Sequence, residues 1–92
     1  MIIEYKEEFN KSVKKLKNNI IAIERLERLI RKLEQAKNLS EIPNVKPIVN
    51  NPTIYRIKTG DYRLFILYRN GEITILLLEY AKRNEKTYKN YN

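Results

Sequence analysis

The part of the sequence that most limits the possible folds is residues 54–80, where two tight-turn signals interrupt alternating apolar and polar residues. Asn70-Gly71 is the preferred pair for a two-residue hairpin loop, because both central residues of a type I′ turn need a positive φ. Gly60-Asp61 suits a second two-residue loop, with glycine in the first position. These turns predict three antiparallel strands joined by two hairpins.

Alternation with a period of two sorts the side chains of these strands onto two faces. One face is apolar and is expected to form part of the core: Tyr55, Ile57, Leu64, Ile66, Ile73, Ile75 and Leu77. The other face is expected to carry a cationic cluster at one end and apolar residues beyond it: Arg56, Lys58, Arg63, Phe65, Leu67, Leu76 and Leu78. The second turn predicts that Leu64 pairs with Leu77 across the last hairpin.

Lys58 and Arg63 are expected to lie directly opposite each other across the first hairpin. Like charges in this position are destabilising by roughly 0.2–1 kcal/mol. Two interpretations stay open at this point. Both side chains can turn into water, where the repulsion is small. Alternatively, the pair can form a binding site for an anion, of which a phosphate is the most obvious.

Composition excludes several classes of function. The chain has 92 residues, 19 Lys+Arg against 11 Asp+Glu, and a formal net charge of +8. Such a charge favours nucleic acid, an acidic protein or an anionic membrane surface as a partner. Because the chain has no cysteine and no histidine, disulfides, the usual zinc sites, the Ser–His–Asp triad and cysteine nucleophiles are excluded. Any catalysis must therefore rest on Lys, Arg, Tyr, Asp or Glu.

The remaining segments predict an α+β fold. Residues 1–5 are a short apolar run and predict an N-terminal strand at an edge of the sheet. Residues 6–17 and 20–37 carry apolar residues at helical spacing. They predict an antiparallel two-helix hairpin packed on a three- to four-stranded, mainly antiparallel sheet, with a short coiled coil as the alternative. Residues 38–52 hold all three prolines and are expected to be loop.

The length predicts one domain, residues 1–92. No signal peptide or membrane span is expected, so the cytoplasm is the default location. Two basic segments have an ordinary and a functional interpretation. The lysines of residues 6–17 can form a solvated helix face or dock on a polyanion. Residues 81–92, AKRNEKTYKNYN, can be a frayed terminus or hold single-stranded nucleic acid, with cations on phosphates and rings on bases.

The order strand–helix–helix–loop–meander and the segment YRIKTGDYRLFI resemble the RelE/ParE toxin superfamily over nearly the whole chain. The resemblance implies a RelE/ParE-like fold and a toxin of a type II toxin–antitoxin system. RelE-type members are ribosome-dependent endoribonucleases that cut mRNA in the A site. They carry basic residues on the sheet and after the last strand, together with a C-terminal tyrosine. ParE-type members poison DNA gyrase and usually lack this set, so the chain is most similar to the RelE type.

The resemblance implies roles residue by residue. Arg56 and Lys58 stand where RelE-type toxins often carry two lysines on the sheet, so the arginine at position 56 is a departure from the pattern. Arg63 matches the arginine of the middle strand, and Arg83 matches the arginine after the last strand. The implied catalytic residues are Lys58, Arg63, Arg83 and Tyr88, and the implied phosphate-binding residues are Arg56 and Lys82.

Tyr88 resembles the C-terminal tyrosine, at a spacing from Arg83 one residue shorter than expected, and Tyr91 is the alternative. The implied mechanism is attack by the 2′-OH of the RNA, without a metal or cofactor. The two arginines of the sheet would hold the developing negative charge. Lys58, Tyr88 or Arg83 would move protons, and which group is the base stays open.

The implied partners are mRNA on the ribosome, rRNA contacted through the basic surface, and a small cognate antitoxin, with no membrane partner. The antitoxin is expected to dock on two places. One is the helix grooves, and the other is the apolar half of the mixed face, which is the face that also carries the cationic cluster: Phe65, Leu67, Leu76 and Leu78. The alternative is that the C-terminal tail covers that half itself. Two other functions stay open. They are a ParE-like toxin that acts on DNA gyrase, and a non-catalytic module that binds RNA or an antitoxin.

Overall fold

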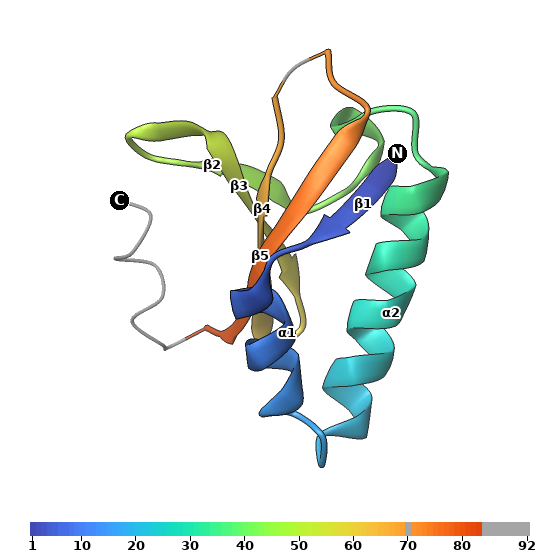
Figure 1. Cartoon of the computed structure of the whole chain (residues 1–92), viewed down its shortest axis with the longest axis vertical. Helices are drawn as coiled ribbons and strands as arrows, with labels where there is room; N and C mark the ends of the chain where they lie inside the picture. The colour runs from blue at the N-terminus through green and yellow to red at the C-terminus, as the bar shows by residue number, and fades with distance from the viewer. Residues whose placement is uncertain (70, 84–92) are drawn as a thin grey trace.

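The computed structural model describes residues 1–69 and 71–83, which form one mixed sheet with two helices packed against it (Figure 1). The elements in chain order are β1 (Ile2–Tyr5), α1 (Glu7–Lys14), α2 (Ile20–Gln35), a 3₁₀ turn (Leu39–Glu41), β2 (Val45–Ile48), β3 (Asn51–Thr59), β4 (Tyr62–Leu67) and β5 (Thr74–Lys82). The strand order is β1-β5-β4-β3-β2, in which β1 runs parallel to β5 and the other neighbours are antiparallel. The expected α+β class, with the N-terminal strand at an edge of the sheet, is confirmed.

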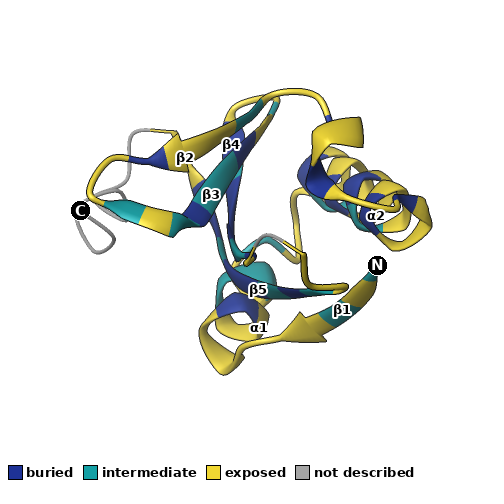
Figure 2. Cartoon of the chain, turned by 90° about the horizontal axis from the view of Figure 1, so that it is seen from above, coloured by how far each residue is buried: buried dark blue, intermediate teal, exposed yellow. Residues whose placement is uncertain are grey.

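The helices form the expected antiparallel hairpin (Figure 1), and their buried residues face the sheet (Figure 2). Asn19 caps α2, because its side-chain oxygen accepts a hydrogen bond from the Ala22 N–H at 3.1 Å. The buried stripe of α2 consists of Ala22, Leu26, Leu29 and Leu33. α1 buries Phe9 and ends at Lys14, earlier than the predicted residue 17. No helix in the described part of the chain is both long and apolar enough to cross a membrane.

The main core lies between the helices and the face of the sheet that they cover. Five of the side chains predicted for this face have exposed fractions of 1% or less: Ile57, Leu64, Ile66, Ile75 and Leu77. Tyr55 is partly buried against the same cluster. The prediction for Ile73 is wrong, because this residue lies in the connection before β5 and is 63% exposed.

Residues 38–52 do not form the expected loop. They contain the 3₁₀ turn, β2 and the first residues of β3, so the sheet has five strands where three to four were expected. β2 pairs with β3 in antiparallel register, with Lys46 opposite Arg56 and Pro47 opposite Tyr55. Proline is tolerated here because β2 is an edge strand, on which an N–H group that faces outward needs no partner in the sheet.

The β3–β4 hairpin has the predicted register, with Lys58 opposite Arg63 and a positive φ of 62° at Gly60. The β4–β5 hairpin differs from its prediction, since β4 ends at Leu67, β5 begins at Thr74 and pairing begins with Leu67 opposite Leu76. Asn70 of the predicted turn lies outside the described residues. Before the bulge in β5, the register of β5 on β4 is therefore shifted by two residues from the predicted one. An even slip keeps the buried residues of β5 on the core face, and burial of that face is what sets strand register.

β5 contains a bulge at Leu78. Phe65 pairs with Glu79 whereas Ile66 pairs with Leu77, so Leu78 is an extra residue on β5. The bulge reverses the alternation that follows it, so that Leu78 and Glu79 lie on the face away from the helices while Tyr80 turns into the helix-side core. The prediction that Leu64 pairs with Leu77 is accordingly wrong, since Leu64 pairs with Tyr80.

Tyr80 is held in the core by its ring and by its hydroxyl. Its ring stacks on that of Tyr62, with centroids 5.0 Å apart, and its hydroxyl donates to the Ala22 carbonyl at 3.1 Å. Burial raises the pKa of Tyr80 to about 12, so the phenol stays neutral at physiological pH.

α1 holds β5 directly after the bulge. The last bond on the β1 side runs from the Lys6 N–H to the Leu77 carbonyl, at 3.0 Å. Ser12 then takes over as the partner of β5, because its hydroxyl accepts from the Tyr80 N–H at 3.0 Å and donates to the Phe9 carbonyl at 2.7 Å. The bulge is therefore fixed between a strand partner and a helix partner.

Candidate functional site

The face of the sheet away from the helices carries cations in two neighbouring rows. One row runs Lys46, Arg56, Phe65 and Glu79 across β2, β3, β4 and β5, and the next runs Lys58, Arg63 and Ala81 across β3, β4 and β5. The two rows bring four cations and one carboxylate together. We call the part of this face that holds Lys46, Arg56, Lys58 and Arg63 the cationic face.

The arginines of the cationic face are held down on the sheet. Arg56 and Arg63 are half-buried, and the Arg56 Nε and Arg63 Nη1 atoms are fully buried. Lys46 and Lys58 are exposed. Of the opposed Lys58–Arg63 pair, Lys58 is therefore the more exposed side chain, and part of the Arg63 guanidinium lies in a region of reduced hydration.

Apolar side chains form a floor beside the cations. This second cluster consists of Ile48, Ile54, Phe65, Leu78 and Ala81, with Leu67 and Leu76 packed against it. It confirms that the four apolar residues predicted for the mixed face lie on it together. Water is excluded next to such a floor, so the local dielectric constant is lower and the attraction between the arginines and an anion is stronger.

The residues at the end of β5 divide between the two faces. Lys82 pairs with Tyr62, whose ring lies in the helix-side core, so alternation places Lys82 on the helix side of the sheet and away from the cationic face. The Arg83 N–H donates to the Asp61 carbonyl at 2.8 Å. Arg83 therefore lies beside the loop that follows Lys58. Two predicted or alternative site residues lie outside the described residues: Tyr88 and Tyr91.

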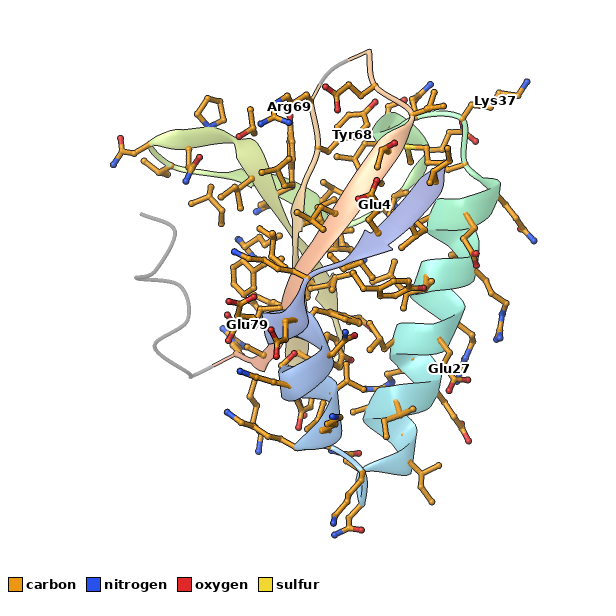
Figure 3. All side chains as sticks on the ribbon, in the orientation of Figure 1. Glu4, Glu27, Lys37, Tyr68, Arg69 and Glu79 are labelled. Atoms are coloured by element: carbon orange, nitrogen blue, oxygen red, sulfur yellow. The ribbon has the colours of Figure 1, made fainter. Side chains whose placement is uncertain are left out.

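Sequence reasoning missed two charged residues that share this face. Lys46 falls in the segment that was expected to be loop, and Glu79 follows the bulge, where strict alternation places it on the helix side. The run of four apolar residues at 75–78 is the one sequence signal that alternation fails in this strand. Figure 3 shows Glu79 near the C-terminal half of β5, on the side away from α2.

A second basic surface lies on the helix side, between α2 and the tip of the β3–β4 hairpin. A pocket of about 290 Å³ is lined there by Arg25, Arg28, Lys32 and Lys58, and the described residues around it include no carboxylate. Arg25 packs so closely on Gly60 that a side chain at this position would collide with its guanidinium. Lys58 therefore lies at the boundary between the cationic face and this basic pocket.

A larger pocket, of about 740 Å³, opens at the other end of the sheet, between the 3₁₀ turn and the β4–β5 connection. Its lining is partly apolar and includes Leu39, Ile42, Tyr55 and Tyr68. It contains no residue of the cationic face. Within residues 1–69 and 71–83, no three His, Cys, Asp or Glu side chains come together in a way that could hold a metal ion.

Comparisons with known proteins identify the family and the fold of the chain. The sequence matches, over residues 3–85, the family described as the ParE toxin of the type II toxin–antitoxin system parDE. A search of curated proteins found no match. Among solved structures, the RelB–RelE antitoxin–toxin complex from Methanococcus jannaschii has a TM-score of 0.75 at 20% identity, over 97% of this chain and 99% of that chain.

Two further structures share the fold. The isolated RelE toxin of E. coli has a TM-score of 0.61 at 17% identity, over 97% of this chain and 92% of that chain. The toxin–antitoxin complex RelBE2 of Mycobacterium tuberculosis has a TM-score of 0.58 at 17% identity, over 89% and 96%. At such identities these likenesses show the fold alone. With the family match over residues 3–85, they place the chain in the RelE/ParE superfamily, as a toxin of a type II toxin–antitoxin system.

Proposed function

We propose that this toxin is a ribosome-dependent endoribonuclease, which cuts mRNA in the A site and so stops translation. The observation that carries the proposal is the cationic face, where Arg56, Lys58 and Arg63 gather on one side of the sheet beside an apolar floor. A surface of this kind suits an RNA phosphate better than it suits a protein target alone. Residues 1–92 would act as one toxin domain.

The RNA supplies its own nucleophile, the 2′-OH, so the protein has to hold charge and move protons. Arg56 and Arg63 would bind the scissile phosphate and stabilise the dianionic phosphorane, which is usually the largest catalytic contribution. Lys58 would protonate the leaving 5′-oxygen, because an ammonium group gives up a proton far more readily than a guanidinium. Arg83 would add positive charge at the hairpin tip, and Tyr88 would stack on a base or take part in proton transfer.

The ribosome would hold the mRNA in the geometry that the attack requires, and the toxin would contact rRNA through its basic surface. The formal charge of +8 and the basic pocket beside α2 support this part of the proposal. Phosphate contacts supply most of the sequence-independent affinity for nucleic acid. Lys82, which is exposed at the end of β5, would bind a phosphate on the helix side.

A cognate antitoxin would neutralise the toxin. Two of the similar structures, from Methanococcus jannaschii and Mycobacterium tuberculosis, are toxin–antitoxin complexes. An apolar helix or extended segment of the antitoxin would dock on the partly exposed edge of the apolar floor, at Leu67 and Leu76 beside Phe65 and Leu78, and in the helix grooves. Acidic residues of the same segment would then cover the cationic face.

A toxin that acts on DNA gyrase is the second candidate, and the match to the ParE toxin family favours it. In that case the cationic face would be a docking surface without chemistry. A module that only binds RNA or its antitoxin would use the same surface in the same way.

Pulse labelling in cells that express the toxin separates these functions. An endoribonuclease lowers amino-acid incorporation first, whereas a gyrase poison lowers thymidine incorporation first. Arg63→Ala should abolish the block in translation. Arg69→Ala should preserve the block in translation. Arg69 is exposed and follows the C-terminal end of β4, whereas the β3–β4 loop precedes the other end of this strand (Figure 3). A fall in thymidine incorporation before translation slows would overturn the proposal.

A further inference from the structure

The bulge in β5 has a chemical consequence, because it places a carboxylate among the cations. Strict alternation after Leu77 would turn Glu79 toward the helices. The extra residue Leu78 instead leaves Glu79 directly opposite Phe65, on the face that carries Arg56 and Arg63. Bulges often occur next to active sites, where they redirect a side chain at the expense of regular pairing.

Glu79 lies within reach of the same anion that the arginines would bind. It shares a row with Arg56, on the far side of Phe65, and it is the diagonal neighbour of Arg63, whose direct partner is Ala81. Diagonal neighbours of this kind have Cα atoms about 7–8 Å apart, a span that long side chains bridge. Ala81 presents only a methyl group opposite Arg63, and Glu79 is half-buried.

The chemistry of the proposed reaction needs a proton acceptor, and the cations of this face are poor ones. An ammonium or guanidinium group carries its proton at neutral pH and acts as a donor. The chain has no histidine, which is the most common general base. Among the residues of the two rows, Glu79 is the one with a carboxylate, and an ionised carboxylate accepts protons.

We propose that Glu79 is the general base of the reaction, a role that rests on the proposed function. Its carboxylate takes the proton of the 2′-OH, and the 2′-oxygen then forms a bond to phosphorus. The bond between phosphorus and the 5′-oxygen breaks with its electron pair, and Lys58 gives a proton to that oxygen. The products are a 2′,3′-cyclic phosphate and a 5′-OH, after which Glu79 returns its proton to water and Lys58 takes one back.

The competing role for Glu79 is electrostatic, in which the carboxylate merely offsets the charge of the arginines around it. The two roles predict opposite effects of neutralisation. A carboxylate that only offsets charge repels the RNA phosphate, so its removal should strengthen binding and leave the rate unchanged or higher. A general base contributes about 10²–10⁴-fold to the rate, so its removal should slow the chemical step without loss of binding.

The test is single-turnover cleavage of a short mRNA on programmed ribosomes, with saturating toxin, for the wild type, Glu79→Gln and Glu79→Asp. We expect Glu79→Gln to slow cleavage by about 10²–10⁴-fold while its affinity for the ribosome is kept, and Glu79→Asp to recover part of the rate. Glu27→Gln is the matched control, because Glu27 is an exposed glutamate on α2 (Figure 3). It should cut at the wild-type rate.

A substrate in which sulfur replaces the leaving 5′-oxygen separates the base from the acid, because a thiolate leaves without being protonated. This substrate should restore cleavage by Lys58→Ala but not by Glu79→Gln. The proposal is overturned if Glu79→Gln cuts as fast as the wild type, if it loses affinity for the ribosome instead of rate, or if the sulfur substrate rescues it. If the wild type does not cut at all, the proposed function fails and the role of Glu79 falls with it.

Discussion

Replacing Ser12 by alanine tests how α1 fixes the bulge of β5. The Ser12 hydroxyl is the acceptor for the Tyr80 N–H, and Tyr80 is 2% exposed, so the substitution leaves a buried donor without its partner. Such a loss is destabilising by about 1–3 kcal/mol. For a domain of this size, each kcal/mol lowers the Tm by about 4–8 °C. Ser12→Thr keeps a hydroxyl and should recover most of the stability.

Thermal melts and amide hydrogen exchange measure this effect. The Tyr80 amide should exchange faster in Ser12→Ala than in the wild type, because its bond to α1 is lost. Ser40→Ala is the control, since the Ser40 hydroxyl bonds to Asn38 within the exposed 3₁₀ turn, and surface changes of this kind stay within about 0.5 kcal/mol. Equal stability of Ser12→Ala and Ser40→Ala, with Tyr80 exchange unchanged, would refute the role of Ser12.

Two further predictions concern the helix cap and the buried phenol. Asn19→Ala removes the bond to the Ala22 N–H and should lower the free energy of unfolding by about 1 kcal/mol. Asn18→Ala, at the exposed neighbouring position, should lower it far less; denaturant titration compares the two. Burial raises the pKa of Tyr80 from 10.0 to about 12. As the pH rises, the Tyr80 phenol therefore ionises in the unfolded chain before it ionises in the folded protein, and the free energy of unfolding should fall between these two values. Melts at pH 9–12 should show a smaller fall in Tyr80→Phe, and an equal fall in both proteins would contradict the prediction.

Turn chemistry explains both the success and the failure in predicting the sheet. At Gly60-Asp61 the strands on both sides continue to the loop, so the turn residues set the register of Lys58 and Arg63. At the second turn β4 already ends at Leu67 and β5 begins only at Thr74, so the pairing stops short of the turn residues. The Tyr68 N–H still donates to the Thr53 carbonyl of β3, at 2.9 Å, but Tyr68 has no partner in the β4–β5 register. A strong local turn signal does not determine how far the pairing extends toward it.

The two charged residues that were missed depend on contacts distant in sequence. Lys46 joins the cationic face only because residues 45–48 pair with the edge of β3. Pro47 argues against a strand when the sequence is considered locally, so this strand was not predicted. Glu79 joins it only because the bulge is held by Ser12, which lies 68 positions from Tyr80. In contrast, Arg56 and Lys58 follow directly from alternation next to a well-defined turn.

The most direct test of the proposed function is primer extension on a reporter mRNA in a reconstituted translation system. We predict discrete cuts at A-site codons that require ribosomes, that disappear with Arg63→Ala, and that remain with Arg69→Ala. Intact mRNA in the presence of active ribosomes and the wild-type toxin would contradict the endoribonuclease proposal. It would leave the cationic face as a docking surface for gyrase, RNA or an antitoxin.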